Sequence, residues 1–430
     1  MSQDLLKALQ ERGMLEQISD PEGISQALAQ GPVTLYIGFD PTATSLHIGN
    51  LLPIMLLAHF QRAGHRPICL VGGATGMIGD PSGRSSERVL LTNDKVDENV
   101  SKIRSQLSHF LRFEGPQAAL MTNNHDWIAP LSYIDWLRDV GKHFSVNYMI
   151  AKESVRRRLE DRDQGISYTE FSYMLLQSYD FLHLFRTENC KIQAGGNDQW
   201  GNITAGIDLV RKVTGQTAYG LTIPLLTTAS GEKFGKSAGN AVWLDAEMTS
   251  PYQFYQYWIQ ADDRDVERYL RIFSFLELDE IAQICAEHAQ KPELRLAQKR
   301  LASEVTTIVH GAEAVSKVLQ ATEVLFGREI EGLSDADLLT IFADVPSTQL
   351  ERSRLGGELN LTQLLRETGL SASNGEARRL IQAGGVYLNN RKCSDPHMLI
   401  DANSLASETT LVLRSGKKNY HLARFEIKSH

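Results

Sequence analysis

Two short apolar runs flank a helical pattern near the start of the chain. Residues 33–39 and 67–71 are apolar and β-branched over a short length, as buried strands are. Between them, residues 48–63 show a helical pattern, and Gly64 marks the expected helix end. A strand, a helix and a second strand in this order predict a βαβ unit. Such a unit implies a parallel sheet with ligands at the carboxyl ends of its strands.

The pattern changes in the second half of the chain. Residues 250–326 predict helices only, and residues 328–350 are acidic and weakly periodic, as expected of a linker with one short helix. Beyond them the sequence predicts a compact αβ unit, with helices at residues 361–367 and 375–383 and strands at 386–388 and 411–413. A length of 430 residues also suggests two or three domains. The predicted α/β domain, helical domain, linker and small αβ domain span residues 1–228, 229–326, 327–350 and 351–430.

Composition narrows the classes of protein to consider. Hydrophobic residues make up 42% of the chain and charged residues 22%, so wholesale disorder is not expected. No run of 18 apolar residues occurs and residues 1–4 lack the start of a secretory signal, so we expect neither a membrane span nor export. The four cysteines lie far apart without a CxxC pair. That spacing favours the reducing cytoplasm and argues against a zinc site or a disulfide framework.

Charge is unevenly distributed along the chain. The net charge of −8 alone argues against a nucleic-acid partner. Residues 351–430, however, contain 12 Lys or Arg and 8 Asp or Glu, a local charge of +4, which leaves −12 on the other 350 residues. A basic unit on an acidic body indicates where a polyanion would bind, although so modest an excess also arises by chance.

The loop after the first predicted strand is a candidate phosphate-binding site. Residues 40–50 join this strand to its helix, where free N–H groups and the helix dipole favour an anion. Thr42 and His47 add donors, and Gly49 lets a ligand approach the backbone. An ordinary capped turn with a surface histidine is the alternative.

The loop after the second predicted strand is rich in glycine. Residues 72–84 hold five glycines, which allow tight turns or a close ligand, and the run does not match the dinucleotide fingerprint G-x-G-x-x-G. Asp80 is its only carboxylate, and Arg84 and Arg88 are candidate phosphate ligands at helical spacing. A flexible surface loop is the alternative.

Residues 168–185 predict a helix that is apolar nearly all round. Tyr173, Gln177 and Asp180 share an arc of roughly 60° on this helix. A hydroxyl, an amide and a carboxylate on a buried face need partners, which a small polar ligand would supply. The alternative is the solvated face of an amphipathic helix.

Two further segments carry candidate ligand-binding groups. After a predicted strand at residues 190–193, Asp198 and Gln199 stand where a ribose or a carboxylate can be hydrogen-bonded. Residues 230–237 differ from a Walker A loop by one residue, because Ser230 replaces the first glycine. The two lysines of this segment suit a polyphosphate whose charge grows in a transition state, whereas a solvated basic turn is the alternative.

Together these segments resemble, in order along essentially the whole chain, tyrosyl-tRNA synthetases of the bacterial type, which are class I aminoacyl-tRNA synthetases. Residues 47–50, His-Ile-Gly-Asn, resemble the signature His-Ile-Gly-His, and residues 233–237, Lys-Phe-Gly-Lys-Ser, resemble the loop Lys-Met-Ser-Lys-Ser. Both motifs indicate only the class, whereas residues 168–180 and 196–202 indicate the tyrosine enzyme. The resemblance implies an α/β fold, with a Rossmann-like parallel-sheet catalytic domain, an all-helical domain and a small αβ RNA-binding module.

The resemblance also implies a two-step reaction. L-Tyrosine attacks the α-phosphate of ATP, which Mg²⁺ accompanies, to give tyrosyl-adenylate and pyrophosphate, and the acyl group then moves to the 3′ end of tRNA(Tyr). The implied tyrosine ligands are Tyr36 and Asp180 at the phenol, Tyr173, Gln177 and Asp80 at the ammonium group, and Gln199 at the carboxylate. The implied ATP-binding residues are Gly38, Asp40, Gly49, Asn50, Gly196, Asp198, Lys233, Lys236 and Ser237. The implied catalytic residues, which stabilise the phosphates, are Thr42, His47, Arg84, Arg88, Lys233 and Lys236. No resident metal is implied, and the family is a cytoplasmic homodimer.

The chain departs from the family pattern at a few positions. Asn50 replaces the second signature histidine, which contributes to ATP binding in the family, and its amide can still donate a hydrogen bond. Thr44 stands where an acidic residue is common, Ile37 where a cysteine is common, and Ser237 where threonine is common.

Three rival functions remain at this point. A tryptophan synthetase shares the class I core but has no need for a phenol-reading Asp180 beside Tyr36. A P-loop nucleotidase would require residues 230–237 to open a helix directly after a core strand. A non-catalytic RNA-binding relative, such as the splicing cofactors of this family, would not need the lysine pair or the tyrosine pocket.

Overall fold

The computed structural model describes residues 2–41, 43–80, 93–160, 165–232, 234–237, 240–325, 328–330, 332–342, 345–357, 359–416 and 419–426. The chain divides into two compact units, Met1–Thr249 with Gln253–Gly311, and Ser250–Tyr252 with Ala312–His430. The domain divisions expected near residues 228, 326 and 350 stay predictions. Within the described ranges, no helix is both long enough and apolar enough to cross a lipid bilayer.

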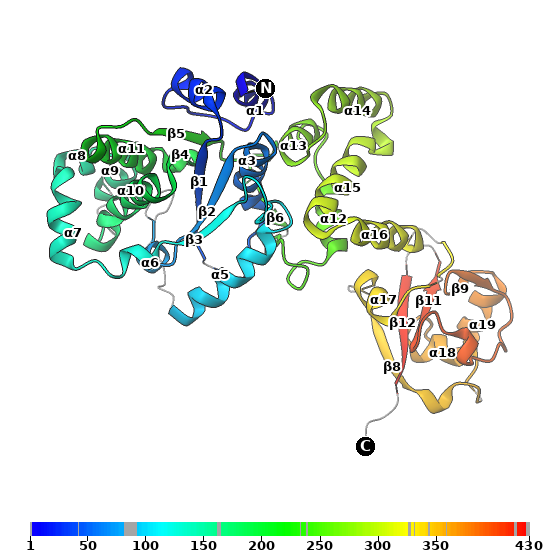
Figure 1. Cartoon of the computed structure of the whole chain (residues 1–430). Coiled ribbons are helices and arrows are strands. Elements are labelled where there is room, and N and C mark those ends of the chain that lie inside the picture. The colour runs from blue at the N-terminus through cyan, green and yellow to red at the C-terminus, as the bar shows by residue number, and fades with distance from the viewer. Residues whose placement is uncertain are drawn as a thin grey trace. The chain divides into compact units, whose positions relative to one another are not determined.

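A five-stranded parallel sheet forms the centre of the first unit (Figure 1). Its strands, in spatial order, are β3 (Leu120–Asn123), β2 (Arg66–Val71), β1 (Thr34–Phe39), β4 (Cys190–Gly196) and β5 (Tyr219–Ile223). Strands β1, β2 and β4 confirm three predicted strands. Because the strand order reverses between β1 and β4, the carboxyl ends of these two strands flank the crevice in which such sheets bind ligands.

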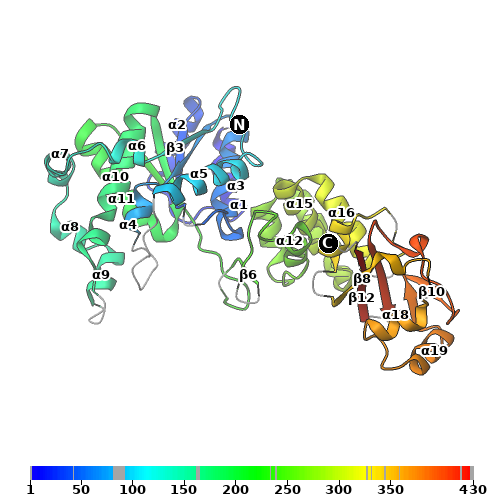
Figure 2. The same cartoon turned by 90° about the horizontal axis from the view of Figure 1, so that it is seen from below.

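Helices cover both faces of this sheet. The first helices of the unit are α1 (Ser2–Glu11), α2 (Pro21–Gln30), α3 (Leu51–Arg62), α4 (Thr75–Ile78), α5 (Asn93–Leu107) and α6 (His125–Ile128). They are followed by α7 (Tyr133–Asp139), α8 (Val146–Ile150), α9 (Glu153–Glu160), α10 (Tyr168–Glu188) and α11 (Trp200–Thr214). Helices α10 and α11 lie on one side of the sheet and α3 on the other, as Figures 1 and 2 show.

Local sequence explains how the site-bearing helices begin and end. Helix α3 follows a 3-10 turn, η1 (Ile48–Asn50). It ends just before Gly64, where the sequence predicted its end, and Gly64 has φ +91°. Ser167 caps α10 by accepting the Glu170 N–H. At its other end Asn189 adopts a left-handed conformation, which allows the chain to turn directly into β4.

The remainder of the first unit is a short hairpin and a set of helices. Its elements are β6 (Lys236–Ser237), β7 (Asn240–Ala241), α12 (Pro251–Ile259), α13 (Val266–Phe273), α14 (Leu278–Gln290) and α15 (Leu296–His310). Helices α12 to α15 agree with the helices predicted from residue 250 onward. Helix α13 buries Val266, Tyr269, Leu270 and Phe273 on one face, which explains why it packs tightly against its neighbours.

The second unit is a small mixed sheet with helices. It contains α16 (Ala312–Leu325), α17 (Asp335–Ile341), α18 (Leu361–Glu367) and α19 (Asn374–Gln382). Its sheet has the order β10 (Arg391–Cys393), β9 (Val386–Leu388), β11 (Thr410–Ser415), β12 (Asn419–Glu426) and β8 (Ser347–Glu351). The segment expected as a linker supplies α17 and β8, and Leu338 and Phe342 are buried in the core of this unit. The described part of this segment therefore packs within the C-terminal unit.

Candidate functional site

Tyr36 and Asp180 lie close together on the α10 side of the sheet. Tyr36 is on β1 and Asp180 on α10, and both side chains are buried. Asn124 Nδ2 and Trp127 Nε1 donate hydrogen bonds to the two carboxylate oxygens of Asp180, over 3.0 Å and 2.8 Å. The Tyr36 hydroxyl is buried and has no hydrogen-bond partner among the described residues. An unpaired buried hydroxyl is costly, so the site is suited to a polar ligand that would pair with it.

Burial dominates the electrostatics of this pair. Loss of solvation raises the pKa of Asp180 from 3.8 to about 7, and the hydrogen bonds from Asn124 and Trp127 offset only part of that rise. Burial, and then the charge of Asp180, raise the pKa of Tyr36 well above its ordinary value. The pair therefore presents a neutral hydroxyl beside a carboxyl group that ionises near neutral pH, an arrangement suited to a ligand with its own hydroxyl group.

Helix α10 brings its three predicted polar residues toward the protein interior. Tyr173 and Asp180 are buried, and Gln177 is half-buried. The alternative of a solvated helix face is therefore wrong. These side chains lie within two turns of one another, so they form one polar stripe along the helix.

A second polar cluster surrounds Asp80, which is buried shortly after α4. Gln199 Nε2 donates a hydrogen bond to Asp80 Oδ2 over 2.6 Å, and Asn202 Nδ2 donates to Gln199 Oε1 over 3.1 Å. The structure thus joins two predicted tyrosine ligands that are far apart in the sequence. A buried carboxylate with an adjacent amide can bind an ammonium group and a carboxylate side by side.

The carboxyl ends of β1 and β4 supply the predicted nucleotide-binding residues. Asp40 directly follows β1, Gly196 ends β4, and Asp198 lies in the next turn, η3 (Asn197–Gln199). Gly38 is exposed although it lies in the central strand, and a side chain built there would meet nothing within 4 Å. The sheet is therefore open above Gly38, as the close approach of a nucleotide requires.

The turn that resembles the first signature is held by its own side chains. The exposed His47 accepts the Gly49 N–H at Nδ1 over 3.0 Å, and the His47 N–H donates to Asn50 Oδ1 over 3.0 Å. Asn50, which replaces the second signature histidine, therefore caps the helix start through its oxygen. This contact gives the substituted residue a structural role in the turn that the sequence predicts to bind phosphate.

The two signature segments lie side by side. The Ile48 N–H donates to Val242 O over 2.8 Å, and the Leu244 N–H donates to Leu46 O over 2.9 Å. Gly235 has φ +92°, and a Cβ atom there would lie 3.3 Å from the Gly49 nitrogen. Glycine is therefore needed both for this backbone conformation and for the close contact between the segments.

The second signature does not form a P-loop. The backbone of Lys236 and Ser237 forms strand β6, which pairs with β7 as an antiparallel hairpin. A Walker A loop would instead open a helix at its lysine. The P-loop nucleotidase alternative is therefore wrong.

Some predicted residues lie outside the described part of the chain. These are Thr42, Arg84, Arg88 and Lys233. Across the residues that are described, no group of three or more His, Cys, Asp or Glu side chains is placed to hold a metal ion.

The structure adds residues that the sequence reading missed. Asn124 and Trp127 hold Asp180, and Asn124 Nδ2 also donates to the Thr75 hydroxyl over 2.9 Å. Trp127 in turn stacks on His183, with ring centroids 4.4 Å apart. Asn124 directly follows the end of β3. Because ligands bind at the carboxyl ends of parallel strands, this position is the signal that identifies Asn124 as a candidate.

Comparison with known proteins identifies relatives of both units. Residues 28–327 match the family model of class I tRNA synthetases for tryptophan and tyrosine, and residues 337–423 match the C-terminal domain model of tyrosine–tRNA ligases. A tyrosine–tRNA ligase of Bacillus velezensis is 53% identical over 425 residues, covering 98% of this chain and 100% of the relative. One from Rhodopirellula baltica is 51% identical over 423 residues, covering 98% and 96%.

Solved structures agree with these matches. The crystal structure of a C-terminally truncated mitochondrial tyrosyl-tRNA synthetase from Aspergillus nidulans is 33% identical and superposes with a TM-score of 0.68. The superposition covers 75% of this chain and 94% of the Aspergillus nidulans chain. The similarity therefore extends from sequence to the arrangement of the sheet and its helices.

Proposed function

This chain belongs to the tyrosine–tRNA ligase family, and we propose that it joins L-tyrosine to tRNA(Tyr) at the expense of ATP. In the first step a tyrosine carboxylate oxygen attacks the α-phosphorus of ATP, and pyrophosphate leaves with the electrons of the broken P–O bond. In the second step the 3′-terminal ribose hydroxyl of the tRNA attacks the activated carbonyl carbon, and AMP leaves. No enzyme nucleophile is needed, because the substrate carboxylate already serves as one.

The observation that carries this proposal is the pocket formed by Tyr36 and Asp180. A tyrosine phenol entering it would pair the buried Tyr36 hydroxyl and donate its own proton to Asp180. Sites of this kind reject an analogue without the hydroxyl because their buried polar groups are then left unpaired, and tyrosine–tRNA ligases are themselves the standard example. A tryptophan side chain, by contrast, carries an indole N–H donor but no acceptor atom, so it would leave the Tyr36 hydroxyl unpaired.

The remaining predicted residues divide between the two ends of the reacting centre. We assign Tyr173, Gln177 and Asp80 to the tyrosine ammonium group and Gln199 to its carboxylate. We assign the ribose and adenylate to the residues at the carboxyl ends of β1 and β4, namely Gly38, Asp40, Gly196 and Asp198. We assign the stabilisation of the phosphates to Thr42 and His47 of one signature, Lys233 and Lys236 of the other, and Arg84 and Arg88. Mg²⁺ enters with ATP as part of the substrate.

Pyrophosphate exchange tests the function directly. The purified protein should incorporate labelled pyrophosphate into ATP when L-tyrosine is supplied, because only adenylate formation is reversible in this way. Phenylalanine and tryptophan, tested at the same concentration, should support much slower exchange. Exchange driven by another amino acid instead of tyrosine would contradict the proposal.

We also propose that the chain works as a homodimer. Helices α7 and α8 carry large apolar side chains that are strongly exposed in the single chain, among them Tyr133 at 61%, Ile134 at 68% and Val146 at 58%. An apolar patch of this kind on a protein surface marks an interface. The second copy is the expected occupant, since the family is dimeric.

Ile134→Asp should weaken this dimer. A charge buried in an apolar interface costs about 2–4 kcal/mol, so the dissociation constant should rise roughly 30- to 1,000-fold. Sedimentation velocity over a concentration series measures that change. Leu294→Asp, at an exposed apolar residue outside the patch, serves as the control. A wild-type chain that stays monomeric at every concentration would exclude the dimer.

The expected tRNA-binding surface lies on the C-terminal unit. Several basic side chains are exposed there, namely Arg352, Arg366, Arg378, Arg379, Arg391 and Lys392. Such side chains neutralise phosphates and release counterions. All four cysteines are free, in keeping with a cytoplasmic site of action.

A further inference from the structure

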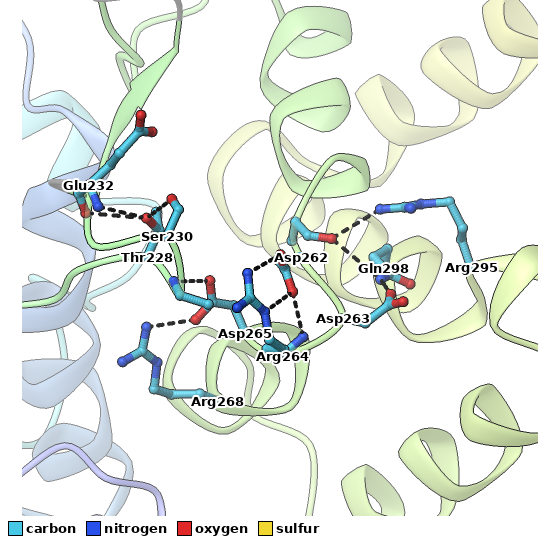
Figure 3. Close-up of polar contacts among 12 residues, drawn as sticks. Thr228, Ser230, Glu232, Asp262, Asp263, Arg264, Asp265, Arg268, Arg295 and Gln298 are labelled. Atoms are coloured by element: carbon cyan, nitrogen blue, oxygen red, sulfur yellow. Dashed lines mark hydrogen bonds and ion pairs between the residues drawn. The ribbon is translucent and has the colours of Figure 1, made fainter.

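Asp265 is a buried carboxylate that does not perform the role its position suggests. It is the N-cap residue of α13, yet its side chain makes no capping hydrogen bond, and the residue is only 4% exposed. Its Oδ2 accepts the Ala229 N–H over 2.7 Å, and its Oδ1 accepts a hydrogen bond from Arg268 over 2.9 Å. Arg268 also donates to the carbonyl oxygen of Thr227 over 2.5 Å. Figure 3 shows this pair extending from α13 to the turn that carries Thr228 and Ser230.

The turn held in this way is closed by its own hydrogen bonds. The Thr228 N–H donates to Glu232 O over 2.9 Å, and the Glu232 N–H donates to the Thr228 hydroxyl oxygen over 3.1 Å. The Gly231 N–H donates to Thr228 O over 2.8 Å. Because the turn is compact, fixing its base at Thr227 and Ala229 fixes the direction in which the chain leaves at Glu232.

The chain is also anchored on the far side of residue 233. Phe234 is buried and stacks on Phe273, with ring centroids 5.3 Å apart and planes 8° from parallel. Other rings that lie within 6.3 Å of it belong to Tyr257, Trp258 and Tyr269. The Gly235 N–H donates to the Tyr257 hydroxyl over 3.2 Å. Thus α12 and α13 hold the segment both before and after the first signature lysine.

We propose that Asp265 and Arg268 are positioning residues for adenylate formation, setting where the chain enters the lysine signature. The proposal rests on the proposed function, in which the signature lysines stabilise the phosphates of ATP. An aspartate at an N-cap normally stabilises its own helix by accepting a backbone N–H of the first turn. Here the carboxylate instead accepts a backbone N–H from a distant segment. Charge stabilisation of a transition state depends steeply on placement, so a small displacement of the loop lowers the rate without affecting the tyrosine pocket.

Asp265→Asn tests the proposal, with Asp262→Asn as a matched control. Asp262 belongs to the same connection and forms an exposed ion pair with Arg264, but it has no hydrogen bond to the turn at residues 227–232 (Figure 3). For Asp265→Asn, the pre-steady-state rate of adenylate formation should fall roughly 10- to 100-fold. The dissociation constant for tyrosine should stay close to wild type, and the melting temperature should remain well above the assay temperature. Asp262→Asn should match wild type in all three measurements.

A second variant separates positioning from folding. Arg268→Lys keeps a donor for Asp265 and should retain most of the rate, whereas Arg268→Gln, which removes the charge, should lose it. Either an unchanged adenylation rate in Asp265→Asn and Arg268→Gln or an equal loss of tyrosine affinity and rate would overturn the proposal. If Asp265→Asn fails to fold, the two Arg268 variants decide by the same criteria. A wild-type protein without tyrosine-dependent exchange would instead refute the proposed function, so the two failures are distinguishable.

Discussion

Asp180→Asn is expected to lower kcat/KM for L-tyrosine roughly 100-fold, because a hydrogen bond to a buried charged acceptor is worth about 3 kcal/mol. The replacement keeps the size of the side chain, so the pocket should not collapse. Its amide would, however, present a donor to Asn124 or Trp127, which already donate to this position. Steady-state exchange assays with tyrosine and phenylalanine measure both the lost rate and the lost discrimination.

The pH dependence of tyrosine binding provides an independent check of the same residue. Because burial raises the pKa of Asp180 to about 7, the empty pocket holds a proton below that pH. The phenol needs the ionised carboxylate, so tyrosine affinity should fall by up to about tenfold per pH unit as the pH drops below 7. Asp180→Asn should show a flat profile. Unchanged tyrosine affinity in this variant would refute the assignment of Asp180 to the phenol.

The contribution of Asp180 to the stability of the empty protein should depend on pH in the opposite direction to tyrosine affinity. Its pKa is higher in the folded protein than the ordinary value of 3.8, so the folded state retains a proton that the unfolded chain has released. This contribution to stability is therefore fully present below about pH 4 and is lost as the pH rises through about 7. A pH above about 7, which favours tyrosine binding, therefore lowers the stability of the folded protein without tyrosine. Melting curves of wild type and Asp180→Asn at pH 5 and pH 8 separate the two effects.

Much of the fold follows from local patterns, because burial imposes a period on each element. Strand β1 and helix α10 were predictable since one is continuously apolar and the other is apolar nearly all round. Strand β3 is half-buried along its whole length, so it has no apolar run to recognise. Strand β8 alternates between exposed and half-buried positions at a sheet edge, and its partner β12 lies far along the chain. Pairing of that kind is set by the tertiary fold, which local periodicity does not encode.

The candidate site could be predicted to a similar degree. The residues that could not be predicted are those whose roles depend on tertiary contacts. The polar stripe of α10 shows in the sequence because Tyr173, Gln177 and Asp180 recur at helical spacing on one arc that large apolar residues flank. The role of Trp127 cannot be seen in the sequence, because a tryptophan near a strand end is usual in a protein core. Only its hydrogen bond to Asp180 reveals that role. The role of Asp265 is even harder to recognise from the sequence. It lies in a run of charged residues typical of a solvated turn, and its burial separates it from the exposed Asp262.

Removing most of the C-terminal unit, residues 326–430, should separate the two steps of the reaction. A chain ending at Leu325 retains the sheet, both signature segments and the tyrosine pocket, so tyrosine-dependent exchange should stay within a few-fold of wild type. Charging of tRNA(Tyr) should fall on the order of 100-fold or more, because the exposed basic side chains of the lost unit supply salt-dependent phosphate contacts. The truncated Aspergillus nidulans relative supports the expectation that such a chain folds.

The end point of the truncation and the salt concentration decide what a loss of charging means. Ala321 and Val324 of α16 belong to the core of the C-terminal unit, so a chain ending at Leu325 exposes them, whereas one ending at Gly311 does not. Raising the salt from 50 to 200 mM should weaken charging strongly in the full chain and much less in either truncated chain, because the released counterions belong to the missing contacts. If a folded truncated chain loses tyrosine activation as well, the C-terminal unit takes part in the first step and the division of labour between the units is wrong.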